Sequence, residues 1–170
     1  MPNKKIIISV FALSVVSLSV WLLLNPSSNS LPEKDIDQET LHCYFYDYNK
    51  NAPQSTLTKG KGLNTPFDIH QSIQDFNRLS KSKLRWVDTD SASQTITLSV
   101  DSAHFISEQS GSYGAMEWLT QVVYTFTVDP LFDKVHLTFE EGSHLSPGTY
   151  TRNDLSVFIK ENNLYIEIEY

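Results

Sequence analysis

The clearest structural pattern in the chain is the alternation Thr95-Ile96-Thr97-Leu98-Ser99-Val100. Ile96, Leu98 and Val100 share one side of an extended backbone, and the hydroxyl-bearing residues share the other. A strand with this pattern has one buried face and one face in water. A sheet with one covered side is therefore expected around residues 95–100.

Two amphipathic segments supply helices that can pack against a sheet. The first is expected at residues 66–80, where Thr65 can cap the helix and Pro66 suits its first position. The second is expected at residues 112–128, because the residue ahead of Pro130 is disfavoured in helical geometry. Apolar residues recur at helical spacing in both segments: Ile69, Ile73, Phe76 and Leu79 in the first, and Leu119, Val122, Val123 and Phe126 in the second.

Short apolar or alternating runs indicate further strands at residues 41–48, 84–87, 135–139, 155–159 and 164–168. Polar residues 88–93 are expected to join two of these strands as a hairpin turn, and residues 161–163 to join the last two. The resulting order is β-α-β-β-α-β-β-β. It predicts an α+β fold of two layers, with both helices on one face of a mixed or antiparallel sheet.

The N-terminus predicts a membrane segment. Residues 6–24 are 19 consecutive uncharged residues, and a helix of that length is about 28 Å long, close to the ~30 Å hydrocarbon core of a bilayer. This length favours an uncleaved anchor over a signal peptide, in which the apolar part is ~7–15 residues; cleavage after Ser30 is the alternative. Lys4 and Lys5 place the N-terminus inside, so the C-terminal domain lies outside the cytoplasm. The expected organisation is a signal anchor or signal peptide at 1–30, a linker at 31–40 and a folded domain at 41–170.

The charge balance excludes one class of partner. The chain has 13 lysine and arginine residues against 20 aspartate and glutamate residues, and Lys4 and Lys5 are the only charged residues in 1–30. The remaining 11 basic and 20 acidic residues give the exported part a net charge of −9. Such a domain repels phosphate backbones, so no nucleic-acid partner is expected. Cys43 is the only cysteine, which leaves either a buried thiol or a disulfide between molecules.

Four motifs lie between residues 99 and 139: Ser99-Val100-Asp101-Ser102-Ala103-His104-Phe105, Gly111-Ser112, Gln121-Val122-Val123-Tyr124-Thr125-Phe126-Thr127 and Phe132-Asp133-Lys134-Val135-His136-Leu137-Thr138-Phe139. Together they resemble the GerM domain of sporulation and spore-germination proteins. That family has a strand ending in Val-Asp-Leu-Ser, a phenylalanine, a Gly-Ser helix entry, a Gln-hydrophobic-Val-x-Thr-Leu helix and a Val-x-x-Val-x-Phe strand. The strand at 41–48 and the helix at 66–80 fall where the family has theirs, so the resemblance covers about residues 41–140. The chain lacks the family's Ile-Pro-x-Gly-Thr segment and has a longer C-terminal hairpin at 155–170.

The resemblance implies a single copy of a small non-enzymatic module in a bacterial cell envelope. Such a module would be a single-pass membrane protein with its domain outside the cytoplasm, or an exported protein if the leader is cleaved. Its partner would be an envelope protein or peptidoglycan. A homo-oligomeric scaffold, in which strand edges pair between copies, is an alternative.

Aromatic residues are the candidate binding groups. Tyr44, Tyr46 and Tyr48 share one side of the first expected strand, and on an open sheet face their rings could stack on sugar or on protein side chains. Trp86 is a further candidate. If helices cover that face, the same tyrosines belong to the core instead.

The sequence predicts no catalytic set, metal site or cofactor. The five histidines never approach one another or the cysteine at metal-ligand spacing, and no Gly-x-Ser-x-Gly motif is present. A wall-acting hydrolase that uses dispersed carboxylates is the enzymatic alternative, since the distance between an acid and a base depends on the fold. Glu108, Glu117 and Glu140 are its nominal candidates.

Overall fold

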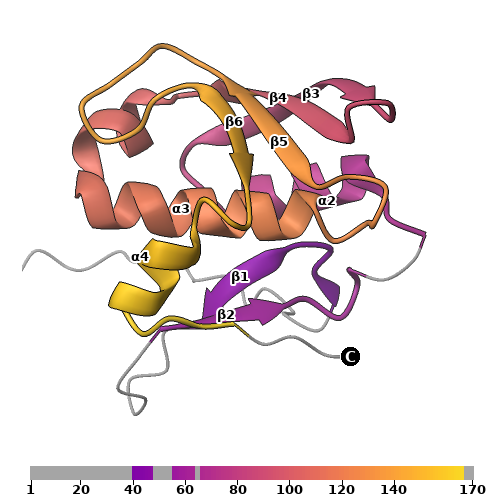
Figure 1. Ribbon diagram of the computed structural model, residues 1–170, viewed down its shortest axis with the longest axis horizontal. Coiled ribbons are helices and arrows are strands. Elements are labelled where there is room, and N and C mark those ends of the chain that lie inside the picture. The colour runs from indigo at the N-terminus through magenta and orange to yellow at the C-terminus, as the bar shows by residue number, and fades with distance from the viewer. Residues whose placement is uncertain (1–39, 48–54, 64–65, 167–170) are drawn as a thin grey trace, which may run out of the picture. The chain divides into compact units, whose positions relative to one another are not determined.

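The computed structural model describes residues 40–47, 55–63 and 66–166, and its elements are arranged around the helix α3 (Figure 1). The strands are β1 (Tyr44–Asp47), β2 (Thr56–Lys59), β3 (Lys83–Asp90), β4 (Thr95–Asp101), β5 (Lys134–Thr138), β6 (Gly148–Thr151) and β7 (Tyr165–Ile166). The helices are α2 (Ile69–Leu79), α3 (Gly111–Phe126) and α4 (Ser156–Glu161), with a short π-helical turn, η2 (Phe105–Gln109). The α+β class predicted from the sequence is confirmed.

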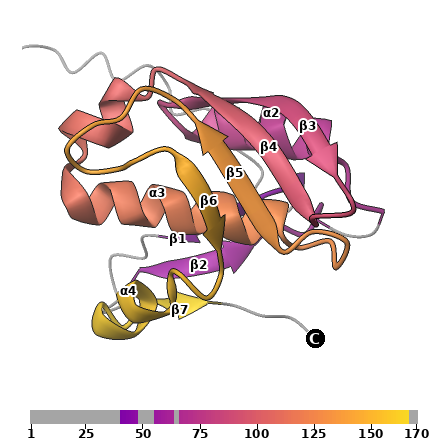
Figure 2. The same ribbon diagram turned by 45° about the horizontal axis from the view of Figure 1, so that its top comes forward.

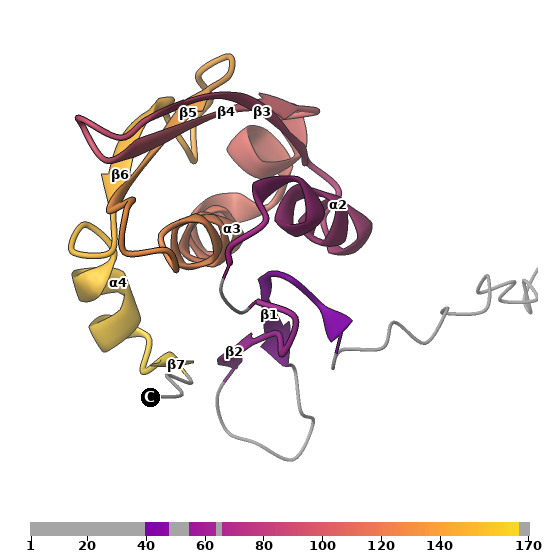
Figure 3. The same ribbon diagram turned by 90° about the vertical axis from the view of Figure 1, so that its right-hand side faces the viewer.

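The alternating segment forms β4 in a four-stranded sheet of order β3-β4-β5-β6. Strands β4 and β5 run parallel, and the other pairs are antiparallel. The apolar side chains of β4 and β5 point to one face: Ile96, Leu98, Val135 and Leu137 are fully buried. Helices α2 and α3 lie against this face (Figure 3). The expected strand with one covered side is therefore present.

The prediction of one sheet is wrong, because β1, β2 and β7 form a second sheet. Strand β2 pairs antiparallel with β1 and parallel with β7. Helix α3 lies between the two sheets (Figure 3), and its residues 118–126 are all buried. A helix that is buried all round needs partners on more than one side. The described domain thus has a sheet on either side of α3 instead of two layers.

The expected C-terminal hairpin is also wrong. Residues 156–161 form α4, and the amide of Ile159 donates to the carbonyl oxygen of Leu155. Val157 is 62% exposed while Leu155 is 1% exposed, so the two do not share a buried strand face. Asn163 takes a left-handed conformation with φ 50° and ends the helix. Only residues 165–166 of the expected last strand are described as extended, in β7.

Several element boundaries differ from the prediction. Thr65 lies outside the described residues, and Asp68 caps α2 by accepting hydrogen bonds from the amides of His70 and Gln71 at 3.0 and 3.1 Å. Strand β3 continues to Asp90, so the turn is shorter than predicted. Strands β2 and β6 were not predicted, because four-residue runs with little apolar content give a weak strand signal.

Figure 2 shows how the chain crosses from β4 to β5 by way of η2 and α3. This crossover connects two parallel strands, as such strands require. The predicted membrane segment at 6–24 lies outside the described residues, and so does the predicted linker at 31–40 apart from Thr40. Within the part that the structure describes, no helix is long and apolar enough to cross a membrane.

Candidate functional site

Tyr44 lies in the core. It is 3% exposed, and its ring packs edge-on against Tyr124 of α3 with centroids 5.8 Å apart. Its backbone amide donates to the Oγ1 of Thr125 at 2.9 Å, and its carbonyl accepts from the Nε2 of Gln121 at 2.8 Å. These contacts join β1 to α3, so the ring of Tyr44 is not available on a surface.

The other aromatic candidates occupy different surroundings. Tyr46 is half-buried, and Tyr48 lies outside the described residues. Trp86 is 43% exposed, and Val87 beside it is 51% exposed. His70 of α2 meets the edge of the Trp86 ring with centroids 5.5 Å apart. Of the described candidates, Trp86 is the aromatic residue that reaches solvent most.

Trp86 lies on an edge strand. Among the described strands, β3 pairs with β4 alone, and all residues in 85–90 are exposed. The pairing shifts register between Trp86 and Asp88, which places a bulge at Val87. We refer to Trp86 and Val87 as the β3 edge patch. An edge strand presents unpaired backbone groups that a further strand can use.

The carboxylates nominated for hydrolysis are only partly brought together. Glu108 and Glu140 line one open cleft of about 620 Å³, whereas Glu117 does not line it. Glu108 accepts hydrogen bonds from the amide and the hydroxyl of Ser143 at 2.9 and 3.0 Å. These bonds hold the pKa of Glu108 below its usual range. A general acid needs a raised pKa instead, so this environment disfavours that role for Glu108.

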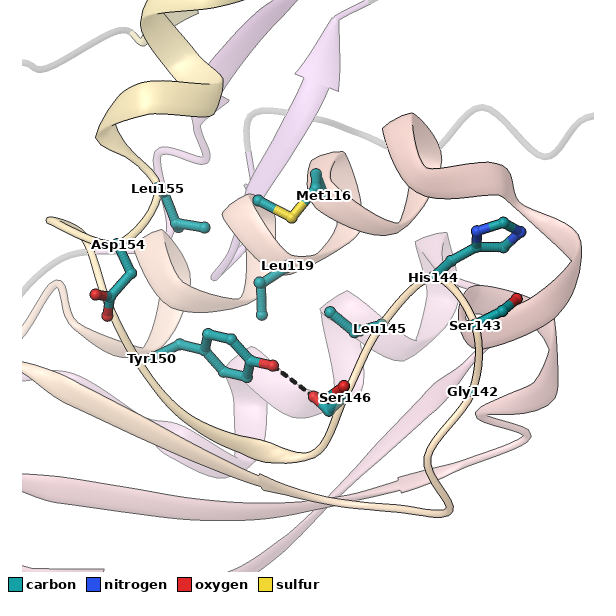
Figure 4. A pocket seen from close by; sticks show the side chains of 10 residues that line it. All are labelled: Met116, Leu119, Gly142, Ser143, His144, Leu145, Ser146, Tyr150, Asp154 and Leu155. Atoms are coloured by element: carbon teal, nitrogen blue, oxygen red, sulfur yellow. Dashed lines mark hydrogen bonds between the residues drawn. The ribbon is translucent and has the colours of Figure 1, made fainter.

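A second hollow lies between α3 and the segment 142–155, and we refer to it as the α3 pocket (Figure 4). It has a volume of about 300 Å³. Its floor is apolar and combines Met116 and Leu119 of α3 with Leu145 and Leu155. Leu119 and Leu155 are each 1% exposed. The floor of the pocket is therefore continuous with the hydrophobic core.

The loop that forms one wall of the α3 pocket is held at several points. The amide of His144 donates to the carbonyl of Ser107 at 2.9 Å, and Ser143 donates to Glu108 as described above. A Cβ atom at Gly142 would lie 2.4 Å from the Cβ of Ser107, so only glycine allows this close approach.

The opposite wall carries an aromatic ring and a carboxylate. The hydroxyl of Tyr150 donates to the carbonyl of Ser146 (Figure 4). Asp154 accepts hydrogen bonds at one oxygen, Oδ2, from both the amide and the hydroxyl of Thr151, each at 2.7 Å. Burial raises the pKa of Tyr150, and the negative charges of Asp154 and Glu141 raise it further. The ring thus stays neutral in a negative field.

No pattern in the sequence predicts the α3 pocket. Its lining comes from a helix and from a loop expected to be only a connection, and no spacing rule links Met116 to Asp154. The one available signal was the presence of two glycines and a proline in this loop, Gly142, Pro147 and Gly148, which indicates a loop of defined shape but no ligand.

Among the described residues, no three histidine, cysteine, aspartate or glutamate side chains lie close enough together to hold a metal ion. No protein-family model matches the chain, and no curated protein or solved structure matches it.

Proposed function

We propose that this chain is a GerM-type, membrane-tethered extracytoplasmic binding module that docks onto a protein of the bacterial cell envelope. The motifs behind the resemblance lie on elements of the expected type: 99–101 at the end of β4, 111–112 at the start of α3, 121–126 inside α3 and 134–138 in β5. The uncharged segment 6–24 supports the tether.

The observation that carries the proposal is the exposed edge of β3. Its unpaired backbone can accept an extended segment as an additional strand, and the side chains of the β3 edge patch supply apolar contact area beside it. The bulge at Val87 interrupts regular pairing, so the added segment would pair mainly with one half of the strand.

The charge of the domain favours a protein partner over peptidoglycan. A net charge of −9 on residues 31–170 attracts basic segments. The peptide stems of peptidoglycan carry carboxylates, which this domain repels. An extended, basic segment of an envelope protein is therefore the proposed occupant of the β3 edge.

Site-specific photocrosslinking tests this proposal. The full chain is expressed in its host with a photoreactive phenylalanine analogue at Trp86, or at Leu131 as a control that is 61% exposed in a loop. We expect one discrete protein adduct from position 86 and none from position 131. The adduct should weaken when Val87 is replaced by lysine, because a charged residue at a strand edge opposes strand addition.

Two results would contradict the proposal. The first is equal adduct yield from positions 86 and 131. The second is co-sedimentation of the full chain with purified peptidoglycan that the Trp86→Ala substitution abolishes, which would make peptidoglycan the ligand.

One observation favours a homo-oligomer as the second candidate. Strand β3 begins with Lys83 and Arg85 and ends with Asp88 and Asp90. Two antiparallel copies of this strand would place the basic half of each opposite the acidic half of the other. Light scattering on the full chain in a neutral detergent separates the candidates: a dimer that the Arg85→Glu substitution disrupts supports the homo-oligomer.

A further inference from the structure

The α3 pocket lies at the far edge of the four-stranded sheet from β3. Tyr150 of its wall belongs to β6, and β6 and β3 are the two outer strands of that sheet. Ligand binding in this pocket would therefore be independent of the β3 edge, and so of the proposed function.

The apolar floor fits an unbranched aliphatic chain. Met116, Leu119, Leu145 and Leu155 line it without a charged group between them. A volume of about 300 Å³ is at the lower limit for ligand sites. It is suited to one long side chain rather than to a larger molecule.

The rim of the pocket is negative. Asp154 lines it, and Glu141 is tied to it through a hydrogen bond from the hydroxyl of Ser146 at 2.8 Å. The lining residues include no lysine or arginine. Asp154 uses Oδ2 for both of its bonds to Thr151, which leaves Oδ1 able to accept from a ligand. The ring of Tyr150 beside it offers a face that attracts cations.

Both walls are already ordered. Glu108 and Ser107 hold the loop at residues 143–144, and Thr151 fixes the carboxylate of Asp154. A ligand would then lose little free energy to ordering the site.

We propose that the α3 pocket binds the side chain of a lysine displayed by a basic protein partner. Its aliphatic stem lies on the floor of Met116, Leu119 and Leu155, and its ammonium group lies at the rim, where it donates to Asp154 and faces the ring of Tyr150. A lysine of a protein is favoured over the amine of a peptidoglycan stem because the neighbouring stem carboxylates would meet the same negative rim.

Methionine methyl NMR can observe this site in the intact protein. Met116 and Met1 are the only methionines, so the full chain, labelled at the methionine methyl carbons and held in a neutral detergent, gives at most two signals. The Met116→Leu variant identifies the pocket signal. The probes are lysine blocked at both ends, and norleucine blocked in the same way, which has the stem without the charge.

We expect blocked lysine to shift the Met116 signal saturably, with a dissociation constant in the millimolar range and weaker binding at high salt. Blocked norleucine should bind about two- to fivefold more weakly, which is the factor that one partly exposed ion pair contributes. The Asp154→Asn variant should weaken lysine binding by a similar factor, because asparagine keeps an oxygen for the Thr151 bonds but loses the charge. Asp88→Asn removes the same charge from exposed β3 and should leave lysine binding unchanged.

Three results would overturn the proposal. One is equal binding of the lysine and norleucine probes. Another is an equal effect of Asp154→Asn and Asp88→Asn, since a general charge effect would then explain the binding. The third is that a lysine-containing stem peptide of peptidoglycan binds more than tenfold more tightly than blocked lysine. Peptidoglycan would then be the ligand of the pocket. None of these depends on whether the β3 edge binds a partner.

Discussion

Asp75 is a buried carboxylate that connects α2 to the residues before β1. It is 2% exposed. Its Oδ2 accepts from the backbone amide of His42 at 3.0 Å and lies 3.0 Å from the Nδ1 of the same residue. Its Oδ1 accepts from Arg78 at 3.2 Å. Burial acts to raise the pKa of Asp75, but the hydrogen bonds from His42, Gln71 and Arg78 outweigh it and hold the pKa below its usual range.

Replacing Asp75 by asparagine should reduce the free energy of unfolding by about 1–3 kcal/mol at pH 7, because the amide group cannot accept from every donor around it. The folded pKa is below the unfolded value of about 3.9, so the stabilisation by the carboxylate is fully present above that value. It is lost as the pH falls through the folded pKa. Urea denaturation of the wild type and of Asp75→Asn tests this. The difference in their free energies of unfolding should be the same at pH 7 and pH 5 and smaller at pH 3.

Asp133→Asn is the matched control, since the Asp133 side chain is 57% exposed beside Lys134. Its effect should stay within about 0.5 kcal/mol at every pH. A difference between wild type and Asp75→Asn that grows at pH 3 would contradict this account of Asp75.

At the scale of elements, the C-terminus of α3 is capped by Arg152 from the segment after β6. The guanidinium donates to the Oγ1 and the carbonyl of Thr127 at 2.8 and 2.9 Å, and it lies 4.6 Å from the centroid of the Tyr124 ring. A cation at this helix end interacts favourably with the helix dipole and with the ring. This single side chain therefore ties the central helix to β6.

Arg152→Lys should cost about 1–2 kcal/mol of stability, because lysine keeps the charge but cannot donate to several acceptors in one plane. Arg85→Lys is the matched control, because it makes the same substitution at an arginine on the surface. The Arg85 side chain is 68% exposed and pairs with Asp101 on the surface, so its loss should cost less than about 0.5 kcal/mol. Thermal unfolding followed by circular dichroism compares the two, and equal losses would show that Arg152 is not a special contact.

At the scale of the whole molecule, the domain buries Tyr44 of β1 in its core, and the two proposed binding sites lie at opposite edges of the four-stranded sheet. The sole thiol, Cys43, is fully buried. Burial, followed by the nearby charge of Asp75, raises its pKa to about 12. Thiols in this state do not react, because the thiolate is the nucleophile.

The buried thiol makes the location of the domain testable with one substitution. Thr149→Cys places a thiol at the exposed position of β6. In intact cells, a maleimide that cannot cross membranes should label this variant if the domain is outside the cytoplasm, and should not label the wild type. Labelling of the variant only after lysis would contradict the proposed location. Labelling of the wild type after denaturation confirms that Cys43 is present and protected.

The sequence alone determined the elements whose side-chain period is strong. The alternation at 95–100 identified β4, and the apolar spacing with the proline at 130 identified α3 and its approximate end. Periodicity is a local property, so it identifies a long element without knowledge of its neighbours. The same reasoning located α2 and β5 to within a few residues.

Only the tertiary structure decided what each element packs against. Residues 41–48 were rightly expected to contain a strand, but nothing local indicates that this strand joins a second sheet and buries Tyr44 against α3. The segment 155–166 has the alternation of a strand, yet it forms α4 and β7. Leu155 and Leu164 are buried while Val157 is exposed, and a helical turn between the two leucines allows this. The α3 pocket depends on side chains up to 39 positions apart in the chain, from Met116 to Leu155. Such a site exists only when long-range packing brings its walls together, and a one-dimensional pattern carries no information about that distance.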